Sequence, residues 1–495
     1  MKLSDQYDHK ALIKYGKWLL ALTALIHFSK GYAALVVAVM ALSSLIRRKP
    51  IELMFFTMFL TLVGIGNAAI FSRSSVAVLT TRVTLVLITF LVVGKVFNSP
   101  KSRPMAPLFG IMGYICWEIV SSLQGYAPIV SLMKLFLFFC IFLSMYGIAN
   151  EVNASTRANA RVLRAAIMSI VALCTIGSVL LIPFPGISLM SKSTIEAQQA
   201  GEAVSLFCGI AAHSQAMGPL AAILGTFIFA DLAFSIRKWD KFYLAMLICC
   251  PLVVYKTSSR TAMGTLVAGC GFVTLMILQS RGVGARWKQR VMTATLSLTI
   301  GLGVAIVALP SLRSKAFNFI LKSKDAGARD LKMENVMSSR QEKIELSKRG
   351  FLEKPILGNG FQVSAQMEDE KRSGIMGYLA APIEKGVWIY AIPEEGGIIG
   401  MLFFCGWLAY LFPTLYRRKA YVLSSTIFAF VVANLGEFSI FSMTYVGGFN
   451  WILVMAAGVL DVARLKDQKV VPVFYVPIEQ LQQEIGMDEW VRRRG

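Results

Sequence analysis

The sequence predicts an all-α fold, a polytopic membrane helix bundle of about 12–14 transmembrane helices with a large helical loop outside the membrane. Of the 495 residues, 56% are hydrophobic and only 16% are charged, and the mean hydropathy of +0.62 lies outside the range of soluble globular proteins. Apolar runs of about 17–22 residues recur along nearly the whole chain, and each can cross roughly 30 Å of hydrocarbon as a helix. The short alternating segments typical of a transmembrane barrel do not occur.

Each predicted helix is an apolar run between polar or charged linkers. The runs cover 14–29, 31–47, 52–72, 76–97, 105–124, 128–149, 162–183, 214–235, 241–256, 261–280, 290–310, 396–415, 420–442 and 446–463. Shorter, tilted or partly re-entrant helices at the first two positions would lower the count to about twelve or thirteen. The chain then divides into an N-terminal transmembrane bundle (1–310), a periplasmic loop or cap (311–395), C-terminal transmembrane helices (396–463) and a cytoplasmic tail (464–495).

The positive charges orient this bundle. The formal net charge is +22, and the excess lies in alternate linkers: Arg47-Arg48-Lys49; Lys101 and Arg103; Arg157, Arg161 and Arg164; Arg237, Lys238 and Lys241; Arg281, Arg286, Lys288 and Arg290; Arg417-Arg418-Lys419. The positive-inside rule makes these linkers and both termini cytoplasmic. In a bacterium this predicts a multi-pass protein of the inner membrane with linkers 184–213, 257–260 and 311–395 in the periplasm. The clusters form no basic stripe interleaved with aromatic residues, so nucleic acid is not a predicted partner.

Arg260, in YKTSSRTAMG (255–264), is the first candidate site residue. It lies in a short outer linker, where removing an arginine from water costs several kcal/mol unless an anion or a polar pocket offsets the cost. Snorkelling to lipid headgroups is the alternative. Ser259 and the neighbouring hydroxyl residues would cap the next helix, and a helix N-terminus with an arginine beside it favours phosphate or pyrophosphate.

The long linker 311–395 supplies a second arginine. A polar helical run is expected from about 338 to 353, and the KPILGNGF that follows it marks a tight turn. Arg340, at the start of this run, would form an anion clamp with Arg260 if the loop caps the outer face, because guanidinium groups bind phosphate oxygens bidentately. A solvated charge at a helix start is the alternative.

Several motifs, in this order and topology, resemble one family. SSRTAMG (258–264), then Arg340, then Pro355 fifteen residues on, then LGNGF (357–361) and EEGGIIG (394–400) resemble the O-antigen ligase and polysaccharide polymerase superfamily, and HSQAMG (213–218) is similar to a polar motif that begins a helix in these proteins. The similarity covers roughly residues 205–410. It implies a metal-independent, inverting glycosyltransferase without a cofactor, which takes a glycan from an undecaprenyl-pyrophosphate carrier at the periplasmic face. It also implies that Arg260 and Arg340 bind the pyrophosphate and stabilise its developing charge.

The sequence departs from the family at the expected general base. Ligases of the family carry a His-Asn pair shortly before the glutamate of the Glu-x-Gly-x-x-Gly motif, and Lys385-Gly386 stand there instead. Three replacements stay open. Glu384 could deprotonate the acceptor hydroxyl or be a solvated carboxylate. His213 could face the same cavity or be an interfacial polar residue. Glu395 could act as the base or stabilise the N-terminus of its own helix.

Other charged residues could support such a site. Arg82 and Lys134, near the outer ends of 76–97 and 128–149, could extend the anionic subsite or snorkel, and Glu118 and Glu437 could pair with them. No metal-binding or nucleotide-binding motif occurs in the sequence, so neither a metal nor a nucleoside-sugar donor is predicted.

The leading prediction is an O-antigen or exopolysaccharide polymerase that passes glycan from the undecaprenyl-pyrophosphate donor to a lipid-linked repeat-unit acceptor, because the ligase-like histidine is absent. An O-antigen ligase that transfers glycan to lipid A core is the alternative. A transporter or flippase of lipid-linked oligosaccharide and a non-catalytic scaffolding subunit of an envelope assembly complex are further alternatives. The predicted partners are the undecaprenyl-pyrophosphate-linked glycan, the lipid bilayer and, for a polymerase, a chain-length regulator.

Overall fold

The computed structural model describes residues 7–71, 75–96, 100–154, 159–191, 205–236, 239–280, 283–308, 341–363, 387–436, 439–442 and 446–467. Within these ranges the chain is an all-α bundle with one small antiparallel ribbon, formed by β1 (Leu189–Ser191) and β2 (Ser205–Phe207). Each apolar run predicted from the sequence falls on a helix. Among the described residues, nine helices are long and apolar enough to cross a membrane, which is the property of a multi-pass membrane protein.

The helices follow the chain in a single series. They are α1 (His9–Phe28), α2 (Ala34–Ile46), α3 (Pro50–Ile65), α4 (Ala68–Phe71), α5 (Ser75–Val96), α6 (Ile111–Leu123), α7 (Pro128–Ala154), α8 (Asn159–Ala172), α9 (Ser178–Leu180), α10 (Pro185–Ser188), α12 (Ser214–Asp231), α13 (Lys241–Lys256), α14 (Arg260–Gln279), α15 (Ala285–Ala308), α18 (Gln341–Glu353), α20 (Trp388–Arg417), α21 (Tyr421–Ala433) and α22 (Val446–Asp467). A 3-10 segment, η1 (Pro100–Gly110), leads into α6, and π-helical turns η2 (Leu173–Gly177) and η3 (Leu232–Ile236) continue α8 and α12.

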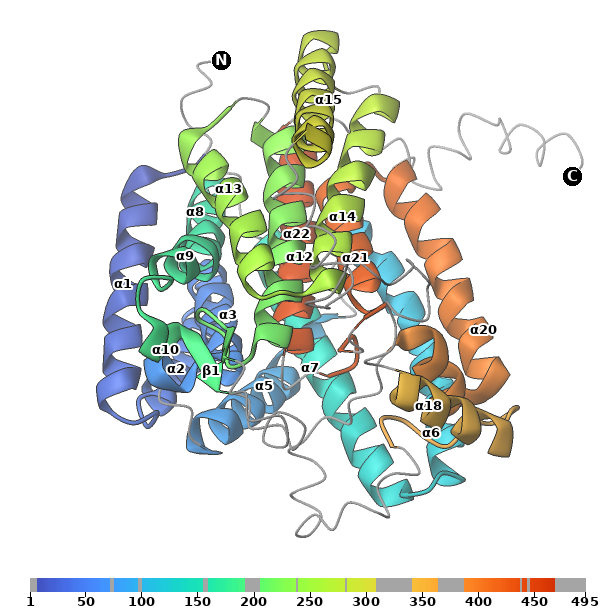
Figure 1. Cartoon of the computed structure of the whole chain (residues 1–495). Coiled ribbons are helices and arrows are strands. Elements are labelled where there is room, and N and C mark those ends of the chain that lie inside the picture. Colours follow the sequence, from blue (N-terminus) through green and yellow to red (C-terminus); the bar gives the residue numbers. More distant parts are fainter. Residues whose placement is uncertain are drawn as a thin grey trace, which may run out of the picture.

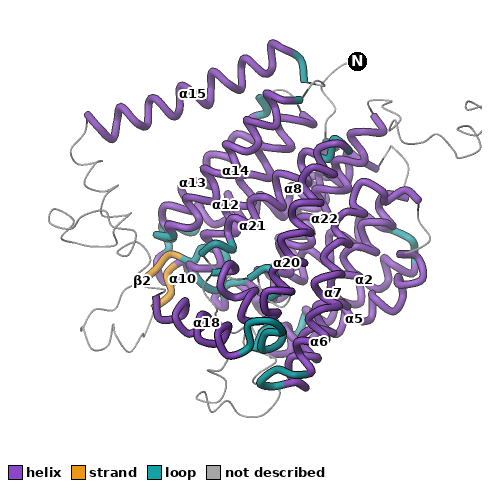
Figure 2. Tube along the Cα trace, turned by 90° about the vertical axis from the view of Figure 1, so that its right-hand side faces the viewer, coloured by secondary structure: helices purple, strands orange, loops and turns teal. Residues whose placement is uncertain are grey.

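Helices α12 and α22 form the centre of the bundle (Figure 1). In each, 94% of the most apolar stretch is buried, against 28% in α1 and α20, which lie at opposite edges of the view. Helices α13, α14 and α21 pack around α12, and α3, α7 and α21 pack against α22. Figure 2 shows α15 running apart from the main bundle, with its start near the ends of α13 and α14.

Helix α20 differs from the prediction at its beginning. It begins at Trp388 instead of 396, and it is interrupted at Gly397, whose φ of 65° and ψ of −165° are not helical. Such a φ favours glycine, because a side chain would be strained there. The second half of α20 therefore restarts at Ile398, whose N–H donates to the carbonyl of Pro355 at 2.8 Å.

Helix α21 ends earlier than the predicted 442. Its C-cap, Asn434, accepts hydrogen bonds on Oδ1 from the N–H groups of Ser439 and Ile440 at 2.5 and 2.7 Å. The same side chain donates through Nδ2 to the carbonyl of Phe430 at 2.6 Å. The Asn434 side chain therefore provides hydrogen-bond partners both for the last turn of α21 and for residues 439–440 after it. These bonds stabilise the turn of the backbone at 434–436.

Backbone contacts group the linkers into two ends of the bundle. At one end, here called the loop end, Ala212 N donates to Ile65 O at 2.9 Å, Tyr126 N to Asn359 O at 3.2 Å, and Trp388 N to Asn434 O at 3.2 Å. At the other, here called the terminal end, Asp8 N donates to Arg161 O at 3.4 Å, and Arg464 donates to the carbonyl of Lys419. The linkers that the charge pattern assigns to opposite sides thus lie at opposite ends.

Candidate functional site

Arg260 is positioned at the loop end by a three-residue linker between α13 and α14. Thr257 is the C-cap of α13, Ser258 takes a left-handed φ of 53°, and Ser259 is the N-cap of α14. The hydroxyl of Ser259 accepts a hydrogen bond from Ala262 N at 3.3 Å, as the sequence predicts for this serine. Arg260 is consequently the first residue of α14, and its side chain is half-buried.

The start of α12 lies directly against this turn. Gly218 is so close that a Cβ there would be 2.8 Å from both Ser259 Cβ and Thr257 Oγ1, well inside van der Waals contact. Gly225 and Gly269 continue the close approach, facing Leu266 and Thr226 respectively. The motifs HSQAMG and SSRTAMG are therefore adjacent, and the N-terminal ends of α12 and α14 lie side by side.

This arrangement concentrates positive potential. A helix N-terminus carries a partial positive charge and unsatisfied N–H groups, so an anion is stabilised there and a cation is not. At Arg260 a guanidinium is added to the positive end of α14, next to the positive end of α12. Phosphate oxygens suit both the N–H groups and the guanidinium fork. This site can chemically bind an anionic group such as a phosphate ester.

His213 and Ser214 begin α12 beside the same turn. His213 is the N-cap through its backbone, whose carbonyl accepts from Ala216 N and Met217 N at 3.1 and 3.0 Å. Its imidazole takes no part in the cap and is exposed. His213 is therefore the N-cap of the helix that packs against Ser259 through Gly218.

The first half of α20 continues this corner. The turn 434–436 packs against Thr261 in the first turn of α14, and Trp388 at the start of α20 is hydrogen bonded to Asn434. Helix α18 lies on α20, with the Lys348 ammonium 5.2 Å from the ring centre of Tyr390. Arg340, the residue before α18, and Glu384 lie outside the described residues.

Glu395 is fully buried in α20, just before the break at Gly397. Its carboxylate accepts a hydrogen bond of 3.5 Å from the hydroxyl of Tyr114 in α6, and its carbonyl accepts from Ser121 Oγ at 2.5 Å. Glu118, which is also fully buried, lies against Gly396 and Gly400. Glu395 therefore lies in the contact between α6 and α20.

The remaining two predicted residues lie on other flanks. Lys134, 7% exposed in α7, donates through Nζ to the carbonyl of Gln362 at 2.9 Å. Arg82 is half-buried in α5, a helix that packs chiefly against α7, α2 and α3. Within the described residues, neither α5 nor α7 packs substantially against α14, the helix that begins with Arg260. Within the same residues, no group of three or more His, Cys, Asp or Glu side chains could hold a metal ion.

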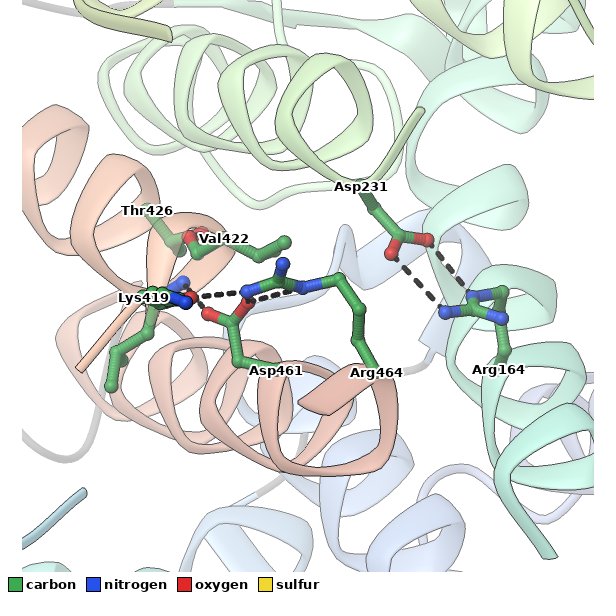
Figure 3. Close-up of polar contacts among 8 residues, drawn as sticks. Arg164, Asp231, Lys419, Val422, Thr426, Asp461 and Arg464 are labelled. Carbon is green, nitrogen blue, oxygen red and sulfur yellow. Dashed lines mark hydrogen bonds and ion pairs between the residues drawn. The ribbon is translucent and has the colours of Figure 1, made fainter. Parts of the chain in front are cut away.

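A second polar cluster, at the terminal end, was not among the sequence predictions (Figure 3). Arg164 of α8 pairs with Asp231 of α12, with 3.1 Å between Nε and Oδ2, and Asp231 also accepts from the hydroxyl of Tyr243 at 2.7 Å. Arg164 is 9% exposed and Asp231 is fully buried. The sequence contained one signal for this cluster, because Asp231 is an acidic residue inside an apolar run.

The neighbouring ion pair lies within α22. Arg464 Nη2 is 3.0 Å from Asp461 Oδ1, and Asp461 Oδ2 accepts from Leu423 N at 2.8 Å (Figure 3). Arg464 also donates to the carbonyl of Lys419 in the α20–α21 linker. One pair therefore links α8, α12 and α13, and the other links α21 and α22.

Comparison with known proteins gives no relative: no family model matches the chain, and no curated protein matches it. The class of protein that the fold defines is a multi-pass helical membrane protein, and its activity rests on the residues of the site.

Proposed function

We propose that the protein is a polysaccharide polymerase of the inner membrane, which transfers glycan from an undecaprenyl-pyrophosphate donor to a lipid-linked repeat unit at the periplasmic face. The loop end would face the periplasm, and both termini would lie in the cytoplasm. The proposal rests on the position of Arg260, which lies where the N-terminal ends of α12 and α14 are adjacent. Fixed positive charge is needed where the pyrophosphate leaving group gains negative charge.

The proposed reaction is a single displacement with inversion. The acceptor hydroxyl oxygen forms a bond to the anomeric carbon of the donor sugar, and the bond from that carbon to the pyrophosphate oxygen breaks. Undecaprenyl pyrophosphate leaves with the electron pair, and a base receives the hydroxyl proton. Arg260 and Arg340 bind the pyrophosphate, while Glu384 or His213 is the candidate base. Of these two, His213 is an exposed residue at the start of α12, the helix whose Gly218 packs against Ser259.

The test is glycan transfer by the purified protein in nanodiscs, with lipid-linked repeat units as donor and acceptor. Arg260→Ala is expected to lower turnover by about 100- to 1000-fold, the usual loss when one charge-stabilising donor is removed. Lys256→Ala is the matched control, because Lys256 is an exposed cation at the end of α13, four residues from Arg260. It is expected to change turnover by less than about twofold. Full transfer by Arg260→Ala would exclude the proposal.

The glycans of a deletion strain would show which acceptor the protein uses. Single repeat units on the final lipid acceptor would indicate a polymerase. Long chains that accumulate on the undecaprenyl carrier would indicate a ligase, and repeat units that stay on the cytoplasmic side would indicate a flippase.

A further inference from the structure

Residues 354–363, here called the clasp segment, connect the end of α18 to the membrane bundle. They pass between the break in α20 and the α6–α7 linker. Asn359 and Phe361 are fully buried, and Lys134 contacts the segment's last part through Gln362. Residues 358–361 therefore lie inside the packed protein, whereas Pro355 and Ile356 are exposed, although the whole segment belongs to the long linker between α15 and α20.

The clasp segment and the helix break satisfy each other's backbone groups. In an unbroken helix the carbonyls of Glu394 and Glu395 would accept from the N–H groups four residues later, but Gly397 interrupts that pattern. Asn359 N and Gly360 N donate to these two carbonyls instead, each at 2.9 Å. In return, the N–H of Ile398 donates to Pro355 O. Each unsatisfied backbone group inside a membrane protein costs several kcal/mol, so separating the two would be expensive.

Two glycines make this crossing possible. Gly358 has a φ of 78°, and a Cβ there would collide with the backbone of Glu395. Gly397, across from it, would collide with the backbone of Ile356. Both residues combine a left-handed φ with contact between two main chains, a combination that only glycine accepts. The LGNGF and EEGGIIG motifs therefore pack directly against each other.

Side chains fix the clasp segment from two further directions. On one side, Ser121 Oγ accepts from Gly360 N at 3.1 Å, and Ser122 Oγ accepts from Phe361 N at 3.2 Å. On the other side, Asn359 donates through Nδ2 to the carbonyl of Gly350, in the last turn of α18, at 2.6 Å. Asn359 is therefore bonded to α18, to α20 and, through Tyr126, to the α6–α7 linker.

We propose that Asn359 is a positioning residue: it holds α18 on α20, and this attachment is required for the proposed action of Arg340, the residue that precedes α18 in the sequence, on the pyrophosphate. This inference rests on the proposed function. It gives the LGNGF motif the role of attaching α18 and not of contacting the substrate. A displacement of about 1 Å in a charge-bearing group is enough to lower turnover by about 100-fold.

The first measurement reports on α18 without any activity. Lys348 and Arg349 are exposed on α18 and are trypsin sites. Asn359→Ala is expected to accelerate cleavage after these residues at least tenfold, because α18 opens more often once its attachment is weakened. Asn67→Ala is the matched control: Asn67 is buried and donates to Ile187 O and Gly209 O, so it holds a different segment of the loop end. This control should leave cleavage of α18 unchanged.

The second measurement is a double-variant comparison of transfer. In the wild-type background, Asn359→Ala is expected to lower kcat by about 100-fold with little change in KM. In an Arg340→Ala background the same substitution should lower kcat by less than about threefold, because Arg340 is the group that Asn359 positions. Ser121→Ala gives a milder version of both effects, and it decides the question if Asn359→Ala does not fold.

Equal losses in both backgrounds, or normal transfer by folded Asn359→Ala, would overturn the positioning role. Unchanged tryptic resistance of α18 in the folded variants would overturn it as well. If the wild-type protein transfers no glycan, the proposed function itself fails, and the role of Asn359 in transfer fails with it.

Discussion

Removing the Asp231 carboxylate is expected to destabilise the bundle by about 3–5 kcal/mol, the usual cost of removing one partner of a buried ion pair. Arg164 Nε is 3.1 Å from this carboxylate and the side chain of Arg164 is nearly inaccessible, so its guanidinium cannot regain a full hydration shell. The hydroxyl of Tyr243 loses its acceptor in the same change. Tyr243→Phe alone removes one hydrogen bond and should cost about 1–2 kcal/mol.

The double variant separates stabilisation by charge from stabilisation by packing. Replacing Arg164 by Met and Asp231 by Leu removes both charges while keeping most of the buried volume. Such a variant should lie within about 2 kcal/mol of the wild-type protein, because the desolvation cost of both charges disappears with their attraction. The double variant is therefore expected to be more stable than Asp231→Ala alone.

The assay is SDS-induced unfolding in mixed micelles, followed by tryptophan fluorescence. Lys14→Ala is the control, because Lys14 forms an exposed ion pair with Glu52, with 3.2 Å between Nζ and Oε1. Exposed pairs contribute about 0–1 kcal/mol. The reasoning would be refuted if Asp231→Ala were no more destabilising than Lys14→Ala, or if the double variant showed the sum of its two single losses.

Three more perturbations test the packing and the ends of α12, α14 and α21 by the same unfolding assay. Gly269→Val should cost about 1–3 kcal/mol, because a Cβ there would lie 3.0 Å from Thr226 Cβ. Gly264→Val is the control and should be nearly neutral, because no atom lies within 4 Å of its Cβ. Equal effects of the two substitutions would contradict the close approach of α12 and α14. Asn434→Ala should cost about 2 kcal/mol, because it leaves two N–H groups without their acceptor; an unchanged midpoint would contradict its role in ending α21. Ser259→Ala should cost about 1 kcal/mol, the usual value of a helix N-cap, and a larger loss would mean that Ser259 does more than cap α14.

The helices were predictable from the sequence because an apolar run of the right length is a local property. The charge pattern also predicted which linkers share an end, and the contacts of Ala212 with Ile65 and of Tyr126 with Asn359 agree with it. The cap at Ser259 was predictable for the same reason, since a serine before a helix acts on residues two or three positions away.

The break at Gly397 was not predictable from local pattern. EEGGIIG was expected to begin a helix, yet the helix already runs from Trp388, and only its second half begins after Gly397. That restart depends on the carbonyl of Pro355, more than forty residues earlier in the sequence, so no local signal contains it. Lys134 shows the same limit, because the carbonyl of Gln362 that it binds comes from the distant clasp segment.

The two ends of the bundle place arginines oppositely relative to the helix dipoles. Arg464 lies near the C-terminal end of α22, where the partial negative charge stabilises a cation, and Asp461 adds a second favourable contact. Arg260 lies at the N-terminal end of α14, where the dipole disfavours a cation by about 0.3–1 kcal/mol. A bound anion offsets that repulsion, because both the helix ends and the guanidinium then face negative charge. The helix dipole and the guanidinium at Arg260 therefore act together only toward an anion, which is the arrangement that the proposed pyrophosphate site requires.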